Sequence, residues 1–158
     1  PSFQSYGNLS WYRPIFEIKR ARGTIASPTI VAASDQLGDF QFSGHDGSNY
    51  ILGAQIAAVV DGTPGTNDMP TRLEFYTTPD GSATPIKNME IDNKGNVSLG
   101  ALSALATNAT DGFSYIPTCA GTPTGTPTSK TGKVPMIYDT TNNKIYIYNG
   151  AWKSITLA

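Results

Sequence analysis

The chain has 158 residues, of which 15% are charged, and eleven basic against twelve acidic residues leave a net charge of −1. A nucleic-acid partner requires a concentrated basic surface that displaces counterions from phosphates, so this near-neutral balance argues against one. No run of about eighteen apolar residues occurs, which argues against insertion into a membrane. The one cysteine, Cys119, cannot form an intrachain disulfide, and we expect a buried, inert thiol there.

Alternation of apolar and polar residues predicts several short strands in the first hundred residues. Gly53 interrupts the longest apolar run and predicts a bulge at that point. Four phenylalanines at strand spacing are expected in the core: Phe16, Phe40, Phe42 and Phe75. The expected strands cover residues 14–20, 29–33, 39–43, 50–60 and 71–77, with two more within 89–99.

The composition changes after residue 100. We expect a linker over 101–112, in which residues 101–106 form the only plausible helical turn, too short to be stable alone. Residues 115–135 are rich in Pro, Gly and Thr, so they cannot form a core of their own and should run extended over another surface. Residues 136–157 predict a three-stranded meander. The predicted domains are therefore 1–100 and 113–158, separated by 101–112.

A meander this small carries more apolar side chains than it can bury by itself. We expect one face to carry Tyr138, Tyr146 and Tyr148, facing either a ligand or a second copy of the chain. A three-stranded sheet of this length is marginal in water on its own. The low charge and the long Pro-Thr-Gly segment further favour chains that wrap around each other, so we predict a homo-oligomer. The apolar residues that need cover are Ile137, Ile145, Ile147, Trp152, Ile155 and Leu157.

Polar residues offer few candidates for catalysis or metal binding. His45, the only histidine, lies in a glycine-flanked turn and is better explained by local hydrogen bonds than by a catalytic dyad. Asp61, Asn67 and Asp68 share a loop that could supply oxygen ligands to calcium, but their spacing does not match a known loop pattern, and a solvated loop is preferred. We therefore predict no catalytic residue, no metal site and no cofactor.

One basic cluster could bind an anionic sugar, although a salt-bridged face is the favoured interpretation. Lys19, Arg20 and Arg22 lie near Glu17, and Asp35 or Asp39 could pair with them. The C-terminal aromatic residues are stronger candidates for ligand binding, because their rings can stack on sugar C–H surfaces at low entropic cost. Packing between chains is the competing explanation for each of these rings. The candidates are Trp152, Tyr148, Tyr146 and Tyr138.

Two ordered strings of motifs resemble known proteins. The first includes Gly44-His45-Asp46-Gly47 and Thr77-Thr78-Pro79-Asp80-Gly81, within residues 20–100, and it resembles the distal domain of bacteriophage tail fibres and of fibre-like bacterial adhesins. The second includes Tyr115-Ile116-Pro117 and Gly150-Ala151-Trp152-Lys153, and it resembles the tips that follow such domains. Together the two strings cover residues 13–157.

The resemblance implies an all-β chain: a β-sandwich or barrel-like domain followed by a small C-terminal β-meander tip, assembled as an intertwined homotrimer. It also implies a location on a virion or a bacterial surface and non-catalytic, multivalent attachment to a cell-surface receptor, often a glycan. The start at Pro1 predicts a fragment or a processed product, and the resemblance implies that the rest of a fibre precedes residue 1. Two alternatives stay open, namely a structural trimerisation cap without receptor binding and a polysaccharide-degrading enzyme of the tailspike type.

Overall fold

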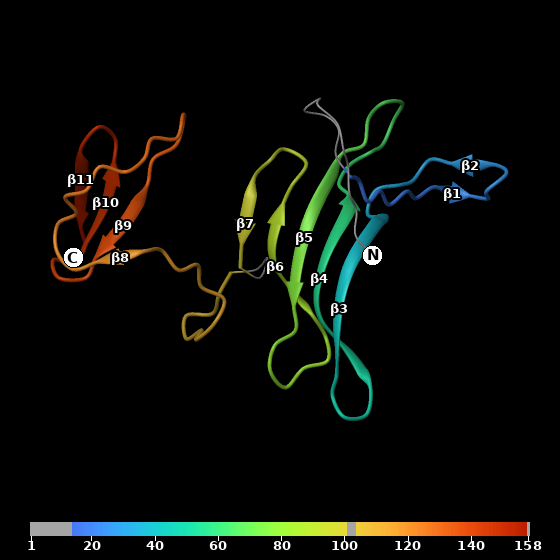
Figure 1. Ribbon diagram of the computed structural model, residues 1–158, viewed down its shortest axis with the longest axis horizontal. Helices are drawn as coiled ribbons and strands as arrows, with labels where there is room; N and C mark the ends of the chain where they lie inside the picture. The colour runs from blue at the N-terminus through green and yellow to red at the C-terminus, as the bar shows by residue number, and fades with distance from the viewer. Residues whose placement is uncertain (1–13, 101–103, 158) are drawn as a thin grey trace. The chain divides into compact units, whose positions relative to one another are not determined.

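The computed structural model describes residues 14–100 and 104–157, which form strands and no helix, so the all-β prediction is confirmed. The chain divides into an N-terminal unit, Pro1–Gly112, and a C-terminal unit, Phe113–Ala158 (Figure 1). The helical turn expected over 101–106 is absent at 104–106, and residues 101–103 lie outside the described part. Within the described ranges, no helix has the length and hydropathy needed to cross a bilayer.

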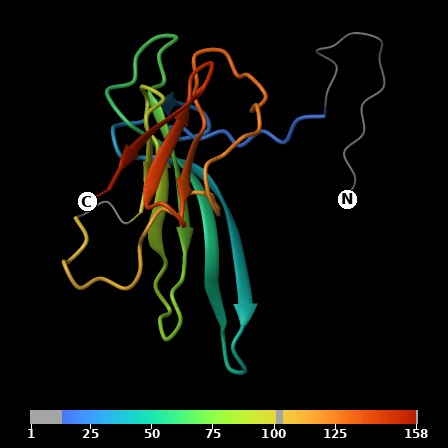
Figure 2. The same ribbon diagram turned by 90° about the vertical axis from the view of Figure 1, so that its left-hand side faces the viewer.

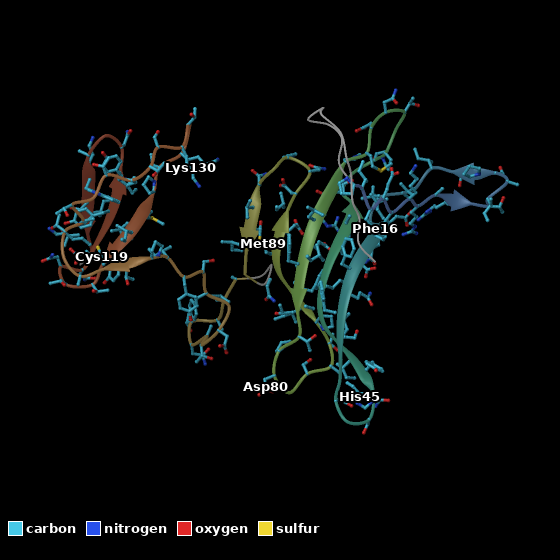
Figure 3. The ribbon with its side chains drawn as sticks, viewed as in Figure 1. Phe16, His45, Asp80, Met89, Cys119 and Lys130 are labelled. Carbon is cyan, nitrogen blue, oxygen red and sulfur yellow. The ribbon has the colours of Figure 1, made fainter. Side chains whose placement is uncertain are left out.

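The N-terminal unit is built on one antiparallel sheet of five strands in chain order. The long β3–β4 hairpin reaches its turn beside His45 (Figure 2, Figure 3). The strands predicted at 39–43, 50–60, 71–77 and within 89–99 all form. They are β3 (Gln36–His45), β4 (Tyr50–Val60), β5 (Thr71–Thr77), β6 (Ile86–Ile91) and β7 (Val97–Leu99). One copy thus supplies a single layer here, and a sandwich or barrel-like arrangement would need layers from further copies.

The sheet has three register shifts, one of them at Leu37 in β3, and the other two are bulges that adjust which side chains share a face. Phe42 pairs with Ala54 and the next residue of β3 pairs with Leu52, so Gly53 is the extra residue, as the sequence predicts. The second bulge lies in β6, where Phe75 pairs with Met89 and the following residue of β5 pairs with Lys87. Because of this extra residue, Lys87 and Glu90 lie on the same face although they are three positions apart.

The strand predicted over 14–20 does not form. The first paired segments are β1 (Arg22–Gly23) and β2 (Pro28–Thr29). Of the strand expected at 29–33, only Thr29 lies in a strand. Ile18 lies over the sheet instead of pairing at its edge: a Cβ built on Gly38 would be 2.6 Å from the Ile18 Cγ2 atom. Ile18 is still 44% exposed, and alternation in a single segment cannot distinguish a paired strand from a segment that contacts the sheet through one apolar side chain.

One face of the sheet is polar and centres on Glu74, which is only 4% exposed. Its carboxylate accepts hydrogen bonds from Arg72 Nε at 2.7 Å, Lys87 Nζ at 2.8 Å and the Tyr76 hydroxyl at 2.6 Å. Burial alone would raise the pKa of Glu74, but the hydrogen bonds from Lys87, Tyr76 and Arg72 outweigh it and lower the pKa to about 2. Long polar side chains thus cover this face within one copy.

The opposite face, which we call the apolar sheet face, has much less cover. Phe42 is 58% exposed and Leu99 is 60% exposed. Phe16, Phe40 and Phe42 are therefore not core residues of a single copy, contrary to the prediction, and Phe75 is half-buried. Strand register places the following residues on this face: Phe40, Phe42, Ile56, Leu73, Phe75, Met89, Ile91, Val97 and Leu99.

The C-terminal unit is a four-stranded sheet in the order β11-β10-β9-β8. The three-stranded meander predicted over 136–157 forms, and a short strand that the sequence did not indicate runs parallel to β9. Cys119 in that short strand is half-buried rather than buried, and its thiol lies 3.1 Å from the Gly121 carbonyl oxygen. The strands are β8 (Thr118–Cys119), β9 (Met136–Asp139), β10 (Lys144–Tyr148) and β11 (Trp152–Thr156).

Candidate functional site

Asp139, at the end of β9, holds the turns of the C-terminal unit and is completely buried. Its carboxylate accepts hydrogen bonds from the backbone amides of Gly121, Thr141 and Asn142 at 2.9, 2.9 and 3.1 Å, and from the Asn142 side chain at 2.7 Å. Burial opposes ionisation, but these donors prevail and lower the pKa of Asp139. The carboxylate therefore fixes the β9–β10 turn to the chain that follows β8.

Three of the four predicted aromatic residues gather on one face of this sheet. Tyr148 pairs directly with Trp152 across β10 and β11, and their ring centroids are 5.2 Å apart at an interplanar angle of 71°. Tyr146 approaches the other side of Trp152 at 6.5 Å and 84°. Such edge-to-face contacts add to the energy of burial and fix the orientation of the rings.

The Pro-Thr-Gly segment covers part of this aromatic face, as the composition predicts. The hydroxyl groups of Thr122 and Tyr146 are 3.0 Å apart, and Tyr146 is buried. The indole N–H of Trp152 donates to the Gly125 carbonyl at 2.7 Å. Both polar groups are thus used within the chain. Tyr148 and Trp152 are both half-buried, and Tyr148 is the one of the three that lines the pocket described next.

Tyr138 lies on the opposite face, which corrects the expectation that it shares a face with Tyr146 and Tyr148. It pairs with Ile145 in β10, and its hydroxyl donates to the Asn143 side chain. We call this second surface the isoleucine face, and Ile155 is 67% exposed on it. Lys153 lies opposite Ile147 on the isoleucine face, whose other members are Met136, Tyr138, Ile145, Ile147 and Ile155.

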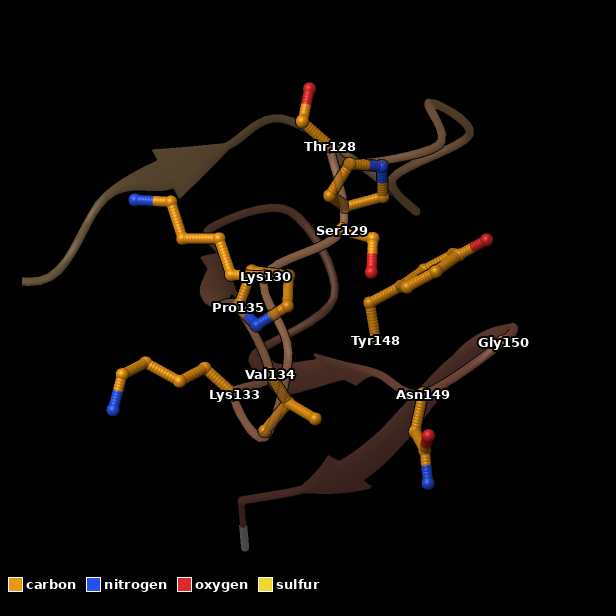
Figure 4. Close-up of a pocket in the computed structure, with 10 residues that line it drawn as sticks. Thr128, Ser129, Lys130, Lys133, Val134, Pro135, Tyr148, Asn149 and Gly150 are labelled. Carbon is orange, nitrogen blue, oxygen red and sulfur yellow. The ribbon is translucent and has the colours of Figure 1, made fainter.

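A shallow pocket of about 400 Å³ lies beside Tyr148 (Figure 4). One wall is the end of β10 with Asn149, and the other is the loop that carries Lys130 and Lys133 (Figure 3, Figure 4). The backbone amide of Lys133 donates to the Lys130 carbonyl at 3.0 Å, closing a turn in which Gly132 has φ +70°. The lining residues are Pro127, Thr128, Ser129, Lys130, Lys133, Val134, Pro135, Tyr148, Asn149 and Gly150.

The pocket is basic because the unit that carries it is basic. Residues 113–158 hold four lysines and one aspartate, Asp139, so their side chains carry a net charge of +3. Asp139 is buried and fully hydrogen-bonded, and no carboxylate lines the pocket. Among the ion pairs of the described residues, none involves Lys130 or Lys133. Both ammonium groups are therefore free to meet an external anion.

The other candidates have structural explanations. His45 accepts a hydrogen bond from the Gly47 amide at 3.1 Å, which fits the predicted turn role. Asp61 pairs with Arg72 at 3.1 Å. No cluster of three or more histidine, cysteine or acidic side chains that could hold a metal occurs in the described ranges.

The basic cluster near residue 20 forms the predicted salt-bridged face. Asp35, rather than Asp39, binds Arg20 at 3.1 Å and Arg22 at 2.6 Å. Hydrogen bonds from Arg22 and from the Ala32 amide are the main reasons that the pKa of Asp35 lies well below its usual range. Lys19 pairs separately with Glu17 at 3.1 Å.

Sequence reasoning missed Lys130, Lys133 and Asn149 as pocket residues. The two lysines give a weak signal, because they are the only charged residues in the stretch 112–138. Asn149 precedes the predicted turn glycine and gave no indication of a ligand. Which of these groups share a pocket depends on the path of the Pro-Thr-Gly loop, which periodicity does not specify.

The fold matches solved structures of phage tail fibres. The carboxy-terminal domain of the bacteriophage T5 L-shaped tail fibre, solved with its intramolecular chaperone domain, aligns with a TM-score of 0.53 and 18% identity over 76% of this chain. The same domain without the chaperone aligns with a TM-score of 0.51 and 18% identity over 82% of this chain. The chain spans 30% and 48% of those two structures. Neither a protein-family model nor a curated protein matches the sequence.

Proposed function

We propose that this chain is the distal part of a homotrimeric virion fibre that attaches to a cell-surface glycan by multivalent binding without catalysis. The fold supports this proposal, because it is that of a phage tail-fibre carboxy-terminal domain. The observation that carries it is the pair of uncovered apolar surfaces, one on each unit.

The apolar sheet face and the isoleucine face support self-association. Soluble monomers rarely leave large contiguous apolar surfaces in water, and those that do usually bind a partner there. A notch of about 230 Å³ in the apolar sheet face, between Ile18, Phe40 and Leu73, could take an apolar side chain from a neighbouring copy. Three copies would then complete the layers that one chain lacks.

The pocket beside Tyr148 supports glycan binding. It is open and shallow, with one tyrosine ring, hydroxyl groups and an amide at its edge, which suits weak recognition of a sugar. Three such sites on one fibre would gain avidity through their high effective concentration at a surface. Glycosidases generally hold two carboxyl groups beside the bond they cleave, and this pocket is lined by none, which favours binding over hydrolysis.

Attachment of the full chain to cells of its host tests the proposal. We expect Tyr148→Ala to reduce attachment about tenfold or more, because avidity multiplies the loss at each of three sites, while the assembled mass stays unchanged. Tyr115→Ala is the matched control, since Tyr115 is 90% exposed and lies outside the pocket. A stable trimer that binds no host cell would favour the structural cap, and release of reducing ends from host polysaccharide would favour the enzyme.

A further inference from the structure

We infer that the pocket beside Tyr148 selects anionic carbohydrate, with Lys130 and Lys133 as the groups that recognise the charge. This inference rests on the proposed attachment function and specifies the chemical class of its receptor. The carbohydrate would carry carboxylate or phosphate groups, as in uronic acid polymers or phosphorylated surface glycans. It concerns the pocket residues alone and requires no chemical step.

The charges of the residues that line the pocket favour an anionic ligand. An anionic ligand meets two lysines here and no carboxylate in the lining. The only acidic side chain of the C-terminal unit, Asp139, is fully buried and already accepts four hydrogen bonds. The remaining lysines of the unit, Lys144 and Lys153, reinforce its positive potential. A neutral sugar would gain no charge–charge attraction from this arrangement.

The backbone fixes the main-chain positions of the two lysines, from which their exposed side chains extend. Lys130 and Lys133 occupy the two sides of a single tight turn, paired as an antiparallel bridge. That turn leads into Pro135, whose carbonyl accepts a hydrogen bond from the Tyr148 amide at 3.2 Å. The lysines and the aromatic ring are therefore linked through a short hydrogen-bonded path, and less entropy is lost when a ligand contacts both.

The arrangement of the lining also indicates the length of the ligand. Figure 4 shows both lysine side chains extending to one side of the pocket, while the Tyr148 ring lies on the other side. A ligand that contacts the ring and the ammonium groups must cross the space between them. An oligosaccharide with charged residues meets this requirement better than a monosaccharide or a free inorganic anion.

Titration of the full chain with defined oligosaccharides tests the inference. The probes are an oligogalacturonate for carboxylate, a phosphorylated oligomannoside for phosphate, and an uncharged oligomannoside of matched length. We expect the unmodified chain to bind at least one anionic probe about tenfold more tightly than the uncharged one, with an affinity that falls as salt rises. The anionic probe that binds identifies the source of the charge.

Substitution of lysines inside and outside the pocket tests which of them bind the anionic probe. Lys130→Gln with Lys133→Gln should weaken binding of the anionic probe about tenfold or more, because two charge-assisted contacts are lost. Lys144→Gln with Lys153→Gln is the matched control, since it removes the same charge outside the pocket. Equal losses in both double variants would overturn the inference in favour of a general effect of net charge. Thermal unfolding of each variant verifies that the fold is intact.

The inference and the proposed function fail in different ways. Binding of the uncharged probe as tightly as the anionic ones, or binding of no probe, overturns the anionic inference even when the chain attaches to host cells. Conversely, pocket-dependent binding of an anionic probe by a chain that attaches to no host cell supports the anionic site and contradicts the attachment role.

Discussion

At the scale of single residues, Glu74 shows how the sheet tolerates a buried charge. Its carboxylate is almost inaccessible to water and is neutralised by Arg72 and Lys87 on the same face. Removing one member of such a network is costly, because the remaining charges stay buried without a partner. The pairing of these residues depends on the β6 bulge, which the alternation of apolar and polar residues did not reveal.

Glu74 also predicts how stability depends on pH. Folding lowers its pKa from 4.5 to about 2, so its stabilising contribution is fully present above pH 4.5 and is lost as the pH falls toward 2. Glu74→Gln should cost about 2 kcal/mol at neutral pH and flatten the stability profile in this window. Chemical unfolding at a series of pH values measures both effects.

Asp80→Asn is the control for this prediction. Asp80 is an exposed turn residue for which the structure gives no ion pair, so its substitution should leave the profile of the unmodified chain in place. A Glu74→Gln variant with an unchanged profile would mean that the network contributes nothing to acid sensitivity.

Residue-level prediction succeeded where a short local pattern decides the outcome. The turn role of His45 and the ion pairs of Arg20 and Arg22 were visible because the partners lie within a few residues or on adjacent segments. Tyr138 was placed on the wrong face because the sequence alone does not give the register between β9 and β10. The pocket lysines were missed because an irregular loop brings them to Tyr148.

At the scale of elements, the sequence predicted the individual strands of the five-stranded sheet and the β4 bulge, but not which strands share that sheet. Regular alternation marks these strands, and turn residues mark their ends. Gly53 has no side chain to keep the pleat regular, which fits the bulge there. The prediction of a strand over 14–20 was wrong. The segment has the pattern of a strand, yet it forms no strand pairing and contacts the sheet through the side chain of Ile18. The pattern predicts a half-buried strand, whereas Ile18 contacts the sheet and remains 44% exposed.

Gly38 provides a test of this packing. A methyl group there would overlap Ile18, so Gly38→Ala should lower the free energy of unfolding by about 1 kcal/mol and displace the side chain of Ile18. Gly44→Ala is the matched control in the same strand, because a Cβ at Gly44 meets nothing within 4 Å. Methyl chemical shifts of Ile18 and thermal unfolding report the two effects, and equal behaviour of the two variants would contradict the packing.

At the scale of the whole molecule, the proposed trimer depends on the apolar sheet face. Phe42→Lys with Leu99→Lys places two charges on this face and should convert the trimer to a monomer, as measured by light scattering at micromolar concentration. Gln41→Lys with Ser98→Lys introduces the same charges at neighbouring positions on the polar face, so that variant should remain trimeric. If the first variant keeps the mass of the unmodified chain, this face is not the interface.

The sequence predicts that one copy has more apolar surface than it can bury. It does not predict on which faces of the fold that surface lies. The count of apolar residues in the meander indicated that one copy is incomplete, and the structure leaves both the apolar sheet face and the isoleucine face exposed. The phenylalanines expected in the core lie on that exposed surface because a single sheet has no second layer to bury them. Composition measures the total apolar surface, and only the fold divides it between the interior and the exterior.

The loop that carries Lys130 and Lys133 is tied down at its two ends, by the Trp152 indole on Gly125 and by the Tyr148 amide on Pro135. The residues between these ties make no strand pairing beyond one small bridge, so their replacement leaves the hydrogen bonds of the sheet in place. Natural variation or engineering can therefore rewrite this stretch freely. Under the proposed attachment function, exchanging it between related fibres would change host range while retaining the same scaffold.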